Sequence, residues 1–521
     1  MNRARNSLPP SSLPPLPGVR GAVLRMLPAL DALRGYSLRD ARADVLAGLT
    51  VAAVAVPQAM AYAMIAHLPV EVGLYTAIVV TAAGALFSPS RQLINGPTNA
   101  ISIAVLSALG PLEGIEQRAQ AAVLLALMVG VIQLAISALR FGDLSRYISH
   151  SVIVGFTAGA GFLLVLDQTK NLLGLRAVGS AEDHFLYRFW RTMSEGGSVH
   201  AATAAVGFAA IALVLALRWL KGRLGIQLLP ELLLVVIAAA WVVAALGLDG
   251  QGVKVVGEIP ATLPSFALPT FTFAQVRDLG SGAFAVAVLG LLEAVSMAKG
   301  IASQTRQRFD VNQLCVSEGA ANLTGAFFHC YPGSGSLTRS AINHQAGGAT
   351  QWSAVVSALA VAATVLLFAP YARYVPRAAL AGILIVSSYK MVDWPAFFYH
   401  LRATRFDLAI VLVTAVSAIA ISVEFCVLVG VLMSFLLAVP RVGRVLLTEF
   451  VLTPEGGIHE RLPDDDGCPQ ILIFGLEGEM FFSAAPSLER HLEAIERRAG
   501  SEARVIVLRM KRARNPDAVG L

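Results

Sequence analysis

The sequence has 521 residues, of which 56% are hydrophobic and only 14% are charged, and its formal net charge is +6. A soluble globular protein carries about a quarter charged residues, so this composition excludes an ordinary soluble chain and indicates a protein that lies in a lipid bilayer. Basic residues in cytoplasmic loops then account for the positive charge, and no nucleic-acid partner is expected.

Residues 1–43 are predicted to form a cytoplasmic arm rich in proline and arginine. Its stretch "NSLPPSSLPPLPG" is expected to be disordered because its composition cannot build a packed core. No signal peptide is recognised in this arm.

Residues 44–443 are predicted to form an all-α polytopic membrane domain. A helix that crosses the hydrocarbon core needs about 20 mostly apolar residues, and stretches such as "AAVLLALMVGVIQLAISAL" at Ala121–Leu139 meet this requirement. About fourteen segments are expected, with approximate centres at Val56, Val79, Ile101, Val129, Gly159, Ile211, Ala238, Val288, Ala320, Ala341, Ala360, Ile385, Val413 and Val431.

The orientation follows from the positive-inside rule. With the N-terminus in the cytoplasm, the loops after even-numbered segments are the basic ones; Arg140 and Arg146 follow the fourth segment, and Arg402 and Arg405 follow the twelfth. The even number of segments returns the C-terminus to the same side. We therefore predict a multi-pass protein of the inner (cytoplasmic) membrane with both termini in the cytoplasm.

Two segments are interrupted in the same way. "NGPTNAIS" and "PGSGSLTRSAIN" each place glycine and proline before hydroxyl residues and a short helix, and Pro97 and Pro332 are 235 residues apart. Pro57 and Glu293, in the first and eighth segments, are 236 residues apart. This common offset predicts two copies of about seven helices, inverted in the membrane because seven is odd. Transporters built from inverted repeats bind substrate between such broken helices.

The broken helices favour an anionic substrate. A helix that begins inside the membrane leaves its first N–H groups unpaired, and its dipole places about half a positive charge there. Hydroxyl and amide side chains add donors, and Arg339 adds a full charge; the donors are Thr98, Asn99, Ser334, Ser336 and Thr338. The alternative is that these motifs only kink packed helices.

Three further residues lie at mid-membrane depth. Gln58 could bond substrate and Tyr62 could wall the pocket, although ordinary helix packing explains each of them equally well. Glu293 in "VLGLLEAVSMAKG" is costly in a membrane, and it is predicted to bind a coupling ion, Na⁺ or H⁺. The alternatives for Glu293 are a salt bridge to Arg339 or Lys299, or permanent protonation.

The segment centred near Ala320 carries Glu318 and Asn322, and one interpretation places part of it at the membrane interface. The four cysteines show no metal-ligand spacing, so no metal site is expected. No pair of nucleophile and base stands out, and no enzyme activity or other cofactor is expected.

The motifs resemble the SulP family of anion transporters from about Arg39 to the C-terminus. The resemblance rests on "DVLAGLTVAAVAVPQAMAYAMIAHLPVEVGLYTAIV", "GPTNAISI" and "NQLCVSEGAANLTGAFFHCYPGSGSLTRSAINHQAGGAT". The sequence departs from the family pattern at Leu314, where glutamate is usual, and at Glu318, where glutamine is common.

The resemblance implies a fold of seven plus seven inverted helices, with core and gate domains that move as an elevator. It also implies a homodimer in membrane lipid and a C-terminal STAS domain. Substrates of the family include sulfate, bicarbonate, chloride and dicarboxylates. The implied binding residues are Gln58, Tyr62, Thr98, Asn99, Gly335, Ser336, Leu337, Thr338 and Arg339, and Glu293 matches an acidic position that helps to hold Na⁺ in some members.

Residues 444–467 are predicted to be a linker, and residues 468–521 the N-terminal part of a STAS domain. "QILIFGLEGEMFFSAAPSLERHLEAIERRAGSEARVIVLRM" predicts strand, turn, strand, helix and strand. The family's D-S-T-G-L turn stands here as Asp517–Leu521 without its hydroxyl residues, and the domain is expected to be incomplete.

Together these observations predict a secondary transporter of inorganic anions. A nucleobase carrier of the same fold is one alternative, although such carriers rely on carboxylates where this chain has Arg339 and hydroxyl groups. A membrane anchor for STAS-mediated interactions that does not transport is the other.

Overall fold

The computed structural model describes residues 24, 26–110, 112, 114–140, 149–179, 183–225, 229–307, 309–421, 423–442, 445–453, 456–462, 465, 468–480, 484–500 and 502–514. The chain divides into two compact units, Met1–Val429 and Gly430–Leu521. The proline-rich stretch of the arm and the Asp517–Leu521 turn lie outside the described residues.

Every predicted membrane segment coincides with a helix. In chain order the helices are α3 (Leu38–Ile65), α4 (Val70–Phe87), α5 (Asn99–Ala108), α6 (Ile115–Ala138), α7 (His150–Leu173), α9 (Ala201–Leu224), α10 (Glu231–Leu246), α11 (Phe273–Thr305), α12 (Val311–Ala326), α13 (Leu337–Gln345), α14 (Trp352–Phe368), α15 (Arg377–Met391), α17 (Arg405–Ala420) and α18 (Val423–Val442). Seven described stretches, in α3, α4, α6, α7, α9, α11 and α14, are long and apolar enough to cross a membrane. The predicted all-α polytopic fold is confirmed.

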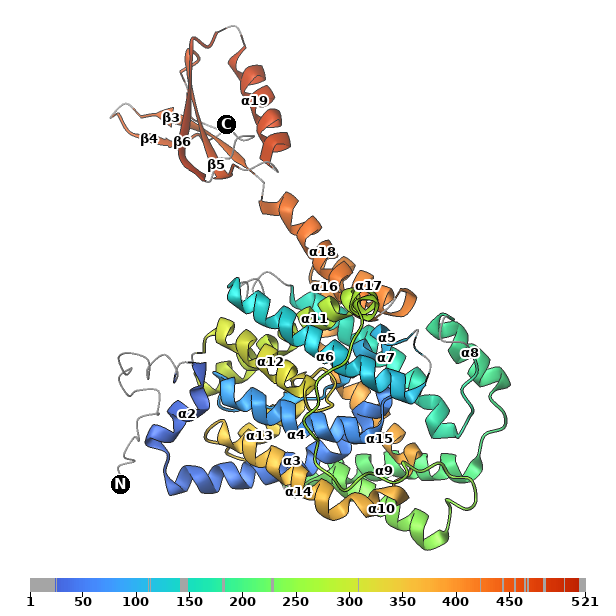
Figure 1. Cartoon of the computed structure of the whole chain (residues 1–521). Helices are drawn as coiled ribbons and strands as arrows, with labels where there is room; N and C mark the ends of the chain where they lie inside the picture. Colours follow the sequence, from blue (N-terminus) through green and yellow to red (C-terminus); the bar gives the residue numbers. More distant parts are fainter. Residues whose placement is uncertain are drawn as a thin grey trace. The chain divides into compact units, whose positions relative to one another are not determined.

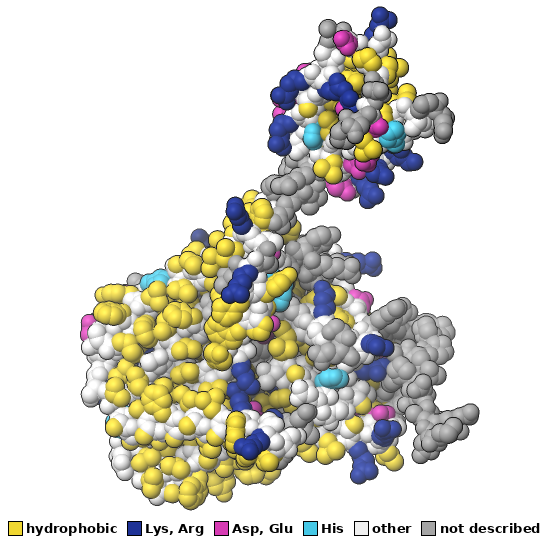
Figure 2. Space-filling model, turned by 180° about the vertical axis from the view of Figure 1, so that it is seen from behind, with side chains coloured by type: hydrophobic (Ala, Val, Ile, Leu, Met, Phe, Trp, Pro, Cys, Tyr) yellow, Lys and Arg dark blue, Asp and Glu magenta, His cyan; other side chains and the backbone are white. Residues whose placement is uncertain are grey.

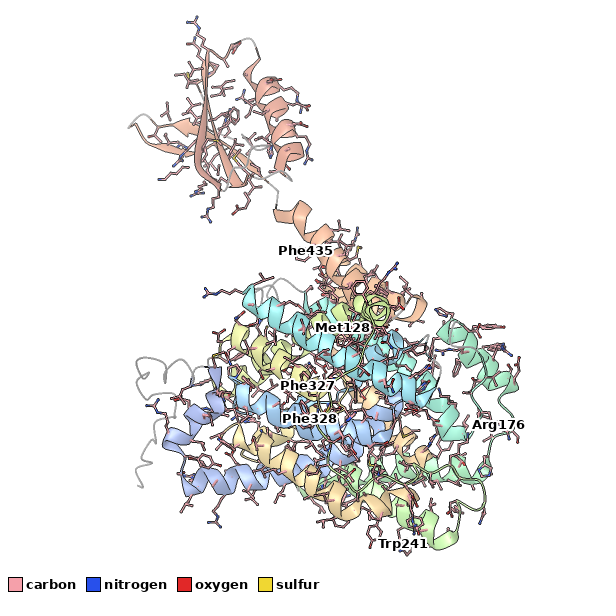
Figure 3. All side chains as sticks on the ribbon, viewed as in Figure 1. Met128, Arg176, Trp241, Phe327, Phe328 and Phe435 are labelled. Atoms are coloured by element: carbon pink, nitrogen blue, oxygen red, sulfur yellow. The ribbon has the colours of Figure 1, made fainter. Side chains whose placement is uncertain are left out.

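Helices far apart in sequence pack side by side in the first unit (Figure 1). α14 lies against α3 and α4, α12 lies against α4 and α6, and α7 lies against α15 and α17. Figure 2 shows a broad expanse of hydrophobic side chains with few charged ones over one face of this unit. Trp241 of α10, at the periphery in Figure 3, is 71% exposed. Such a surface is suited to lipid rather than water.

Three shorter helices were not predicted: α2 (Pro28–Ala32), α8 (Phe185–Glu195) and α16 (Trp394–Ala403). They are too short or too polar to register as membrane segments. On α8, Tyr187 and Trp190 are exposed beside Arg191, a pattern that suits a helix lying in the membrane interface.

The segment around Ala320, for which the sequence allows an interfacial position, is buried within the protein. α12 is enclosed by α4 and α6, and Glu318 and Asn322 are buried. Gly130 of α6 and Gly319 of α12 allow the close approach, because a Cβ at Gly130 would lie 2.5 Å from the Leu323 backbone nitrogen. Small residues at such contacts are the usual means of tight helix packing in membranes.

A two-stranded sheet joins the two interrupted segments. β1 (Asn95–Gly96) precedes α5, β2 (Ser334–Gly335) precedes α13, and the strands pair antiparallel with Gly96 opposite Ser334. The crossing requires glycine, because a Cβ at Gly333 would lie 2.8 Å from the Gly96 carbonyl oxygen. The two breaks predicted from sequence thus meet in space.

Asp44 fastens the first turns of α3 to the loop after α13. Its fully buried carboxylate accepts hydrogen bonds from the backbone N–H groups of Ala349 (2.7 Å) and Thr350 (3.0 Å). The Tyr36 hydroxyl donates to the same group at 3.1 Å. This contact fixes the far end of α13.

The second unit holds a four-stranded sheet of order β4-β3-β5-β6. The strands are β3 (Leu446–Leu452), β4 (Ile458–Glu460), β5 (Ile471–Glu479) and β6 (Val505–Arg514), and α19 (Ala485–Ala499) connects the parallel pair β5 and β6. Leu472 and Phe474 of β5 pack on Ile495 of α19.

Two expectations for this unit need correction. The segment 444–467 is not simply a linker, because β3 and β4 lie within it and β3 pairs with β5. β5 is also one continuous strand where the sequence predicts a strand and a turn. Part of the second predicted strand lies outside the described residues.

Candidate functional site

The short helices α5 and α13 both begin at the β1–β2 crossing. Thr98 caps α5 by accepting a hydrogen bond from the Ile101 N–H (3.3 Å), and Ser336 caps α13 by accepting one from the Arg339 N–H (3.5 Å). Serine and threonine are favoured at these positions because their hydroxyls satisfy a free N–H group of the first turn. Two helix N-termini are thereby brought together inside the protein.

A cavity of about 200 Å³ opens beside these N-termini. Of the ten residues predicted for the site, eight line it: Gln58, Tyr62, Thr98, Asn99, Glu293, Ser336, Leu337 and Thr338. They come from α3, the first turns of α5 and α13, and α11. The sequence pattern therefore selects residues that share one cavity.

The other two predicted residues lie behind the cavity wall. Gly335 belongs to β2, where a Cβ would lie 3.1 Å from Cα of Ala294 on α11. Arg339 is 1% exposed, and its Nη2 donates to the Pro97 carbonyl oxygen at 2.8 Å. Arg339 therefore ties the two breaks together while its charge lies next to the cavity.

The charge of Arg339 is not neutralised by a neighbouring carboxylate. Among the described residues it forms no ion pair, and its Nε has no hydrogen-bond partner. A buried charge without a partner is costly. An anion near the two helix N-termini would offset that cost.

Glu293 faces the cavity from α11. Its Oε2 accepts a hydrogen bond from Thr98 Oγ1 at 2.9 Å, and no described residue forms an ion pair with it. The salt bridges considered to Arg339 and Lys299 are therefore not present. Thr98 links the N-terminus of α5 to Glu293, because its hydroxyl caps α5 and also donates a hydrogen bond to the Glu293 carboxyl group.

Two buried amide groups in the site retain bonding capacity. Gln58 Oε1 and Asn99 Oδ1 are buried and have no hydrogen-bond partner. Since buried polar groups are nearly always paired, their lack of partners suggests contacts with a bound molecule, such as a hydrated ion.

Sequence reasoning missed the opposite wall of the cavity. Arg218 of α9, Glu231 of α10 and Lys390 of α15 also line it. Glu231 lies 3.5 Å from Arg218 Nε and 3.1 Å from Lys221 Nζ. In the sequence, Arg218 and Lys221 stand out only as basic loop residues that help to set the orientation. Lys390 lies at a helix end, and nothing else in the sequence marks it as a site residue.

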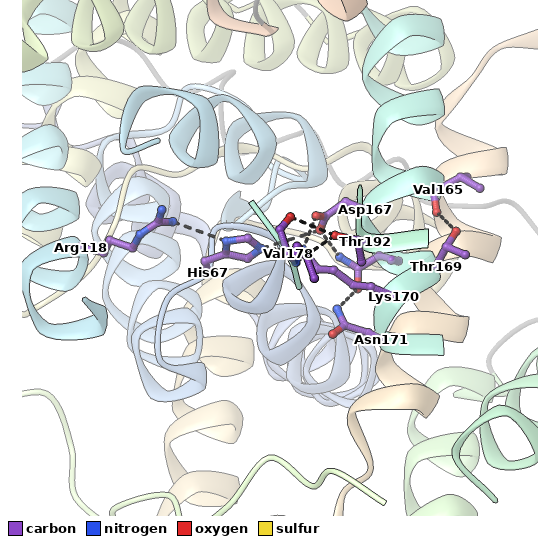
Figure 4. A network of polar contacts seen from close by, with 10 residues as sticks. His67, Arg118, Val165, Asp167, Thr169, Lys170, Asn171, Val178 and Thr192 are labelled. Atoms are coloured by element: carbon purple, nitrogen blue, oxygen red, sulfur yellow. Dashed lines mark hydrogen bonds and ion pairs between the residues drawn. The ribbon is translucent and has the colours of Figure 1, made fainter. Parts of the chain in front are cut away.

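A second charged network lies outside this site (Figure 4). His67, in the turn between α3 and α4, lies 3.9 Å from Asp167 and 3.5 Å from Arg118, and Lys170 donates to Asp167 at 2.6 Å. Burial and the nearby Lys170 lower the pKa of His67 to about 4, although Asp167 opposes the shift. At neutral pH this histidine is uncharged.

These features define a multi-pass membrane carrier with a binding cavity between two broken helices. The family model described as the sulfate permease family matches residues 42–414. The chain therefore belongs to the sulfate permease family, whose members are transporters and not enzymes.

Individual relatives agree with this assignment. A protein of Mycobacterium tuberculosis named a probable sulfate transporter is 30% identical over 470 residues, which cover 89% of this chain and 82% of the relative. The sodium-independent sulfate anion transporter of Bos taurus is 30% identical over 469 residues, covering 84% and 76%.

Solved structures support the fold. The murine Solute Carrier 26 family member A9 anion transporter in the inward-facing state matches with a TM-score of 0.85 at 22% identity, covering 99% of this chain and 87% of that one. The transmembrane domain of the cyanobacterial bicarbonate transporter BicA matches with a TM-score of 0.65 at 23% identity, covering 77% and 98%.

Proposed function

We propose that this chain is a secondary transporter of inorganic anions, with sulfate as the first substrate to test and bicarbonate and chloride as further members of the class. The names of the relatives support sulfate, and the name of one structural neighbour, a bicarbonate transporter, supports bicarbonate as a competitor.

One observation carries the proposal: Arg339 and two helix N-termini converge beside one cavity with no carboxylate paired to the arginine among the described residues. The cavity residues Gln58, Tyr62, Asn99, Leu337 and Thr338 would contact the anion, while Gly335 allows the close packing. Ser336 and Thr98 would hold the N-termini in place. Electrostatic attraction would then come from fixed groups that need no rearrangement.

We further propose that the anion is carried by an elevator movement and that Glu293 binds the coupling ion, Na⁺ or H⁺. Its carboxyl group is joined through Thr98 to the N-terminus of α5. Binding of the coupling ion at Glu293 would therefore change the affinity of the anion site. Thermodynamic linkage requires this influence to act in both directions. No other cofactor is part of the proposal.

The assembly and location are proposed on the family resemblance and on loop charges. The transporter would be a homodimer in membrane lipid, placed in the inner (cytoplasmic) membrane with both termini in the cytoplasm. No nucleic acid is a partner.

The test is uptake by proteoliposomes that contain the purified full chain. Labelled sulfate and bicarbonate are expected to accumulate, whereas labelled uracil is not, because a nucleobase lacks the charge that Arg339 attracts. Uptake of uracil alone would identify a nucleobase carrier, and absence of all uptake would favour a membrane anchor that does not transport.

Coupling is tested in the same vesicles. The Glu293→Gln variant is expected to lose dependence on an imposed Na⁺ or pH gradient, because an amide can accept the Thr98 hydrogen bond but has no negative charge to hold Na⁺ and takes up no proton. A Glu293→Gln variant with the wild-type response to both gradients would remove Glu293 from the coupling site.

A further inference from the structure

A second buried carboxyl group lies behind the anion site. Glu318 of α12 is 1% exposed, and neither of its carboxyl oxygens has a hydrogen-bond partner among the described residues. Its neighbours on the same helix are satisfied: Ser317 Oγ donates to the Gly84 carbonyl oxygen at 2.9 Å, and Asn322 Nδ2 donates to Gln133 Oε1 at 2.9 Å. Among the described side chains of α12, only Glu318 and Asn312, whose Oδ1 is also buried without a partner, depart from this pattern.

The Asn95 side chain is close enough to Glu318 to influence its carboxyl group. Asn95 belongs to β1, is 2% exposed, and has no hydrogen-bond partner for either its Oδ1 or its Nδ2. The side chain packs against α4, because a Cβ at Gly84 would lie 2.5 Å from Asn95 Nδ2. Two polar groups are thus held by the backbone close to each other and away from water.

No cation among the described residues neutralises Glu318. From α11, the group that influences it is the carboxyl group of Glu293, and its own helix adds the buried Cys315 one turn earlier. Arg339 of α13 donates its hydrogen bond to the Pro97 carbonyl oxygen, which follows β1 in the chain, and not to Glu318.

The two helices that enclose α12 add no charge nearby. The ionisable Glu71 of α4 and Glu116 and Arg118 of α6 lie near the starts of those helices, whereas α12 contacts Gly84 and Gly130. At 1.5 Å per residue, these charges are about 18 to 21 Å along the helix from the contacts.

An ionised carboxylate in such a place is strongly disfavoured. A metal ion is a poor solution, because it needs several ligands and the described residues contain no cluster of three or more His, Cys, Asp or Glu side chains. A proton is sufficient: a protonated Glu318 can donate to Asn95 Oδ1 and accept from Asn95 Nδ2.

We propose that Glu318 is a proton-binding site that couples anion transport to protons, an inference that rests on the proposed anion transport. The residues that follow Asn95 are Gly96, Pro97 and Thr98, which join the strand to the anion cavity. The sum of the charges of Arg339, Glu293 and Glu318 is −1 when both carboxyl groups are ionised and +1 when both are protonated. Proton binding therefore favours anion binding, and by reciprocity the anion favours the proton. The result is proton–anion symport.

The test uses the full chain in proteoliposomes and measures the ratio of sulfate uptake with an inwardly directed proton gradient to uptake without one. The wild type is expected to give a ratio well above one, and the Glu318→Gln variant a clearly smaller ratio, because Glu293 is then the one carboxyl group of this pair that can still bind a proton. Glu258→Gln, which removes an exposed carboxylate, is the matched control and keeps the wild-type ratio. A wild-type ratio in Glu318→Gln, or no gradient effect in the wild type, overturns the inference.

Two readouts separate this inference from its alternatives. Glutamine mimics a protonated carboxyl group, so Glu318→Gln is expected to keep the thermal midpoint at pH 7 in detergent; a variant that unfolds shows an ionised, structural carboxylate and overturns the inference. When sulfate binds, the purified wild type should take up protons from the solution. The number of protons taken up per sulfate should be about one higher in the wild type than in Glu318→Gln. Wild-type vesicles that carry no anion at all refute the proposed function itself, whereas anion uptake without the gradient effect refutes only the role of Glu318.

Discussion

At the residue scale, Arg339 has two roles in one side chain. Its hydrogen bond to the Pro97 carbonyl oxygen (2.8 Å) holds the two breaks together, and its charge lies beside the cavity without a carboxylate partner among the described residues. The sequence indicated the charge but not the structural contact, since the residue bonded lies 242 positions away.

Substitution can separate these roles. Arg339→Ala is expected to lower sulfate uptake more than tenfold, because both the charge and the link to Pro97 are lost. Arg339→Gln can keep a donor for Pro97 but not the charge, so it should fold like the wild type and still transport more than tenfold slower. Uptake rates measure the loss of transport, and thermal midpoints measure the loss of stability. Near-normal uptake by Arg339→Gln would show that transport does not need the charge of Arg339.

Single residues also show where sequence reasoning stops. Thr98, Ser336 and Glu293 could be selected because proline, glycine and a mid-membrane acid mark them in the sequence. Arg218, Glu231 and Lys390 could not, because each stands near a helix end, where charged residues are ordinary. Their place in the cavity wall arises from the packing of α9, α10 and α15, which no local pattern encodes.

At the element scale, close helix approach depends on a few glycines. A Cβ at Gly130 would lie 2.5 Å from the Leu323 backbone nitrogen, whereas a Cβ at the helical Gly280 would meet nothing within 4 Å. Gly130→Ala is therefore expected to lower the thermal midpoint by several degrees. Gly280→Ala should leave it unchanged or raise it slightly, because alanine is the better helix former by roughly 0.5–1 kcal/mol. Equal effects of the two substitutions would show that α6 and α12 can move apart freely.

The turn between α3 and α4 gives a pH-dependent element. Burial and Lys170 lower the pKa of His67 to about 4, against about 6.5 in an unfolded chain. Between these values the unfolded state binds more protons, so stability falls as the pH is lowered from about 6.5 toward 4.

The variant His67→Asn tests this sign. Asparagine tolerates the left-handed backbone that His67 adopts, with φ of 54°, but it does not titrate. The loss of thermal midpoint between pH 7.5 and pH 4.5 should therefore be smaller in His67→Asn than in the wild type. If the thermal midpoints of the two proteins fall equally with pH, protonation of His67 does not affect stability.

At the scale of the whole molecule, the sequence predicted the number and order of the membrane segments well. Long apolar stretches in a lipid bilayer can form few structures other than membrane-spanning helices. The repeat offset also identified Pro97 and Pro332 as equivalent residues, and in the structure both lie at the β1–β2 crossing. The second unit was harder to predict: β3 and β4 lie in a stretch that resembles a linker, because short strands carry a weak pattern and gain their stability from pairing with β5. Likewise, the polar residues of α12 suggest an interfacial helix because they face partners that only the tertiary fold supplies.

The placement of the C-terminus in the cytoplasm can be tested with the native cysteines. Cys315, Cys330 and Cys426 are buried, whereas Cys468 in the second unit is exposed. A membrane-impermeant maleimide should therefore label one cysteine in inside-out vesicles and none in intact right-side-out vesicles or cells. Cys468→Ser should remove the signal, which identifies the site without an engineered tag. Labelling of Cys468 from the outside would reverse the orientation derived from the arginine-rich loops, and with it the side from which each end of the cavity is reached.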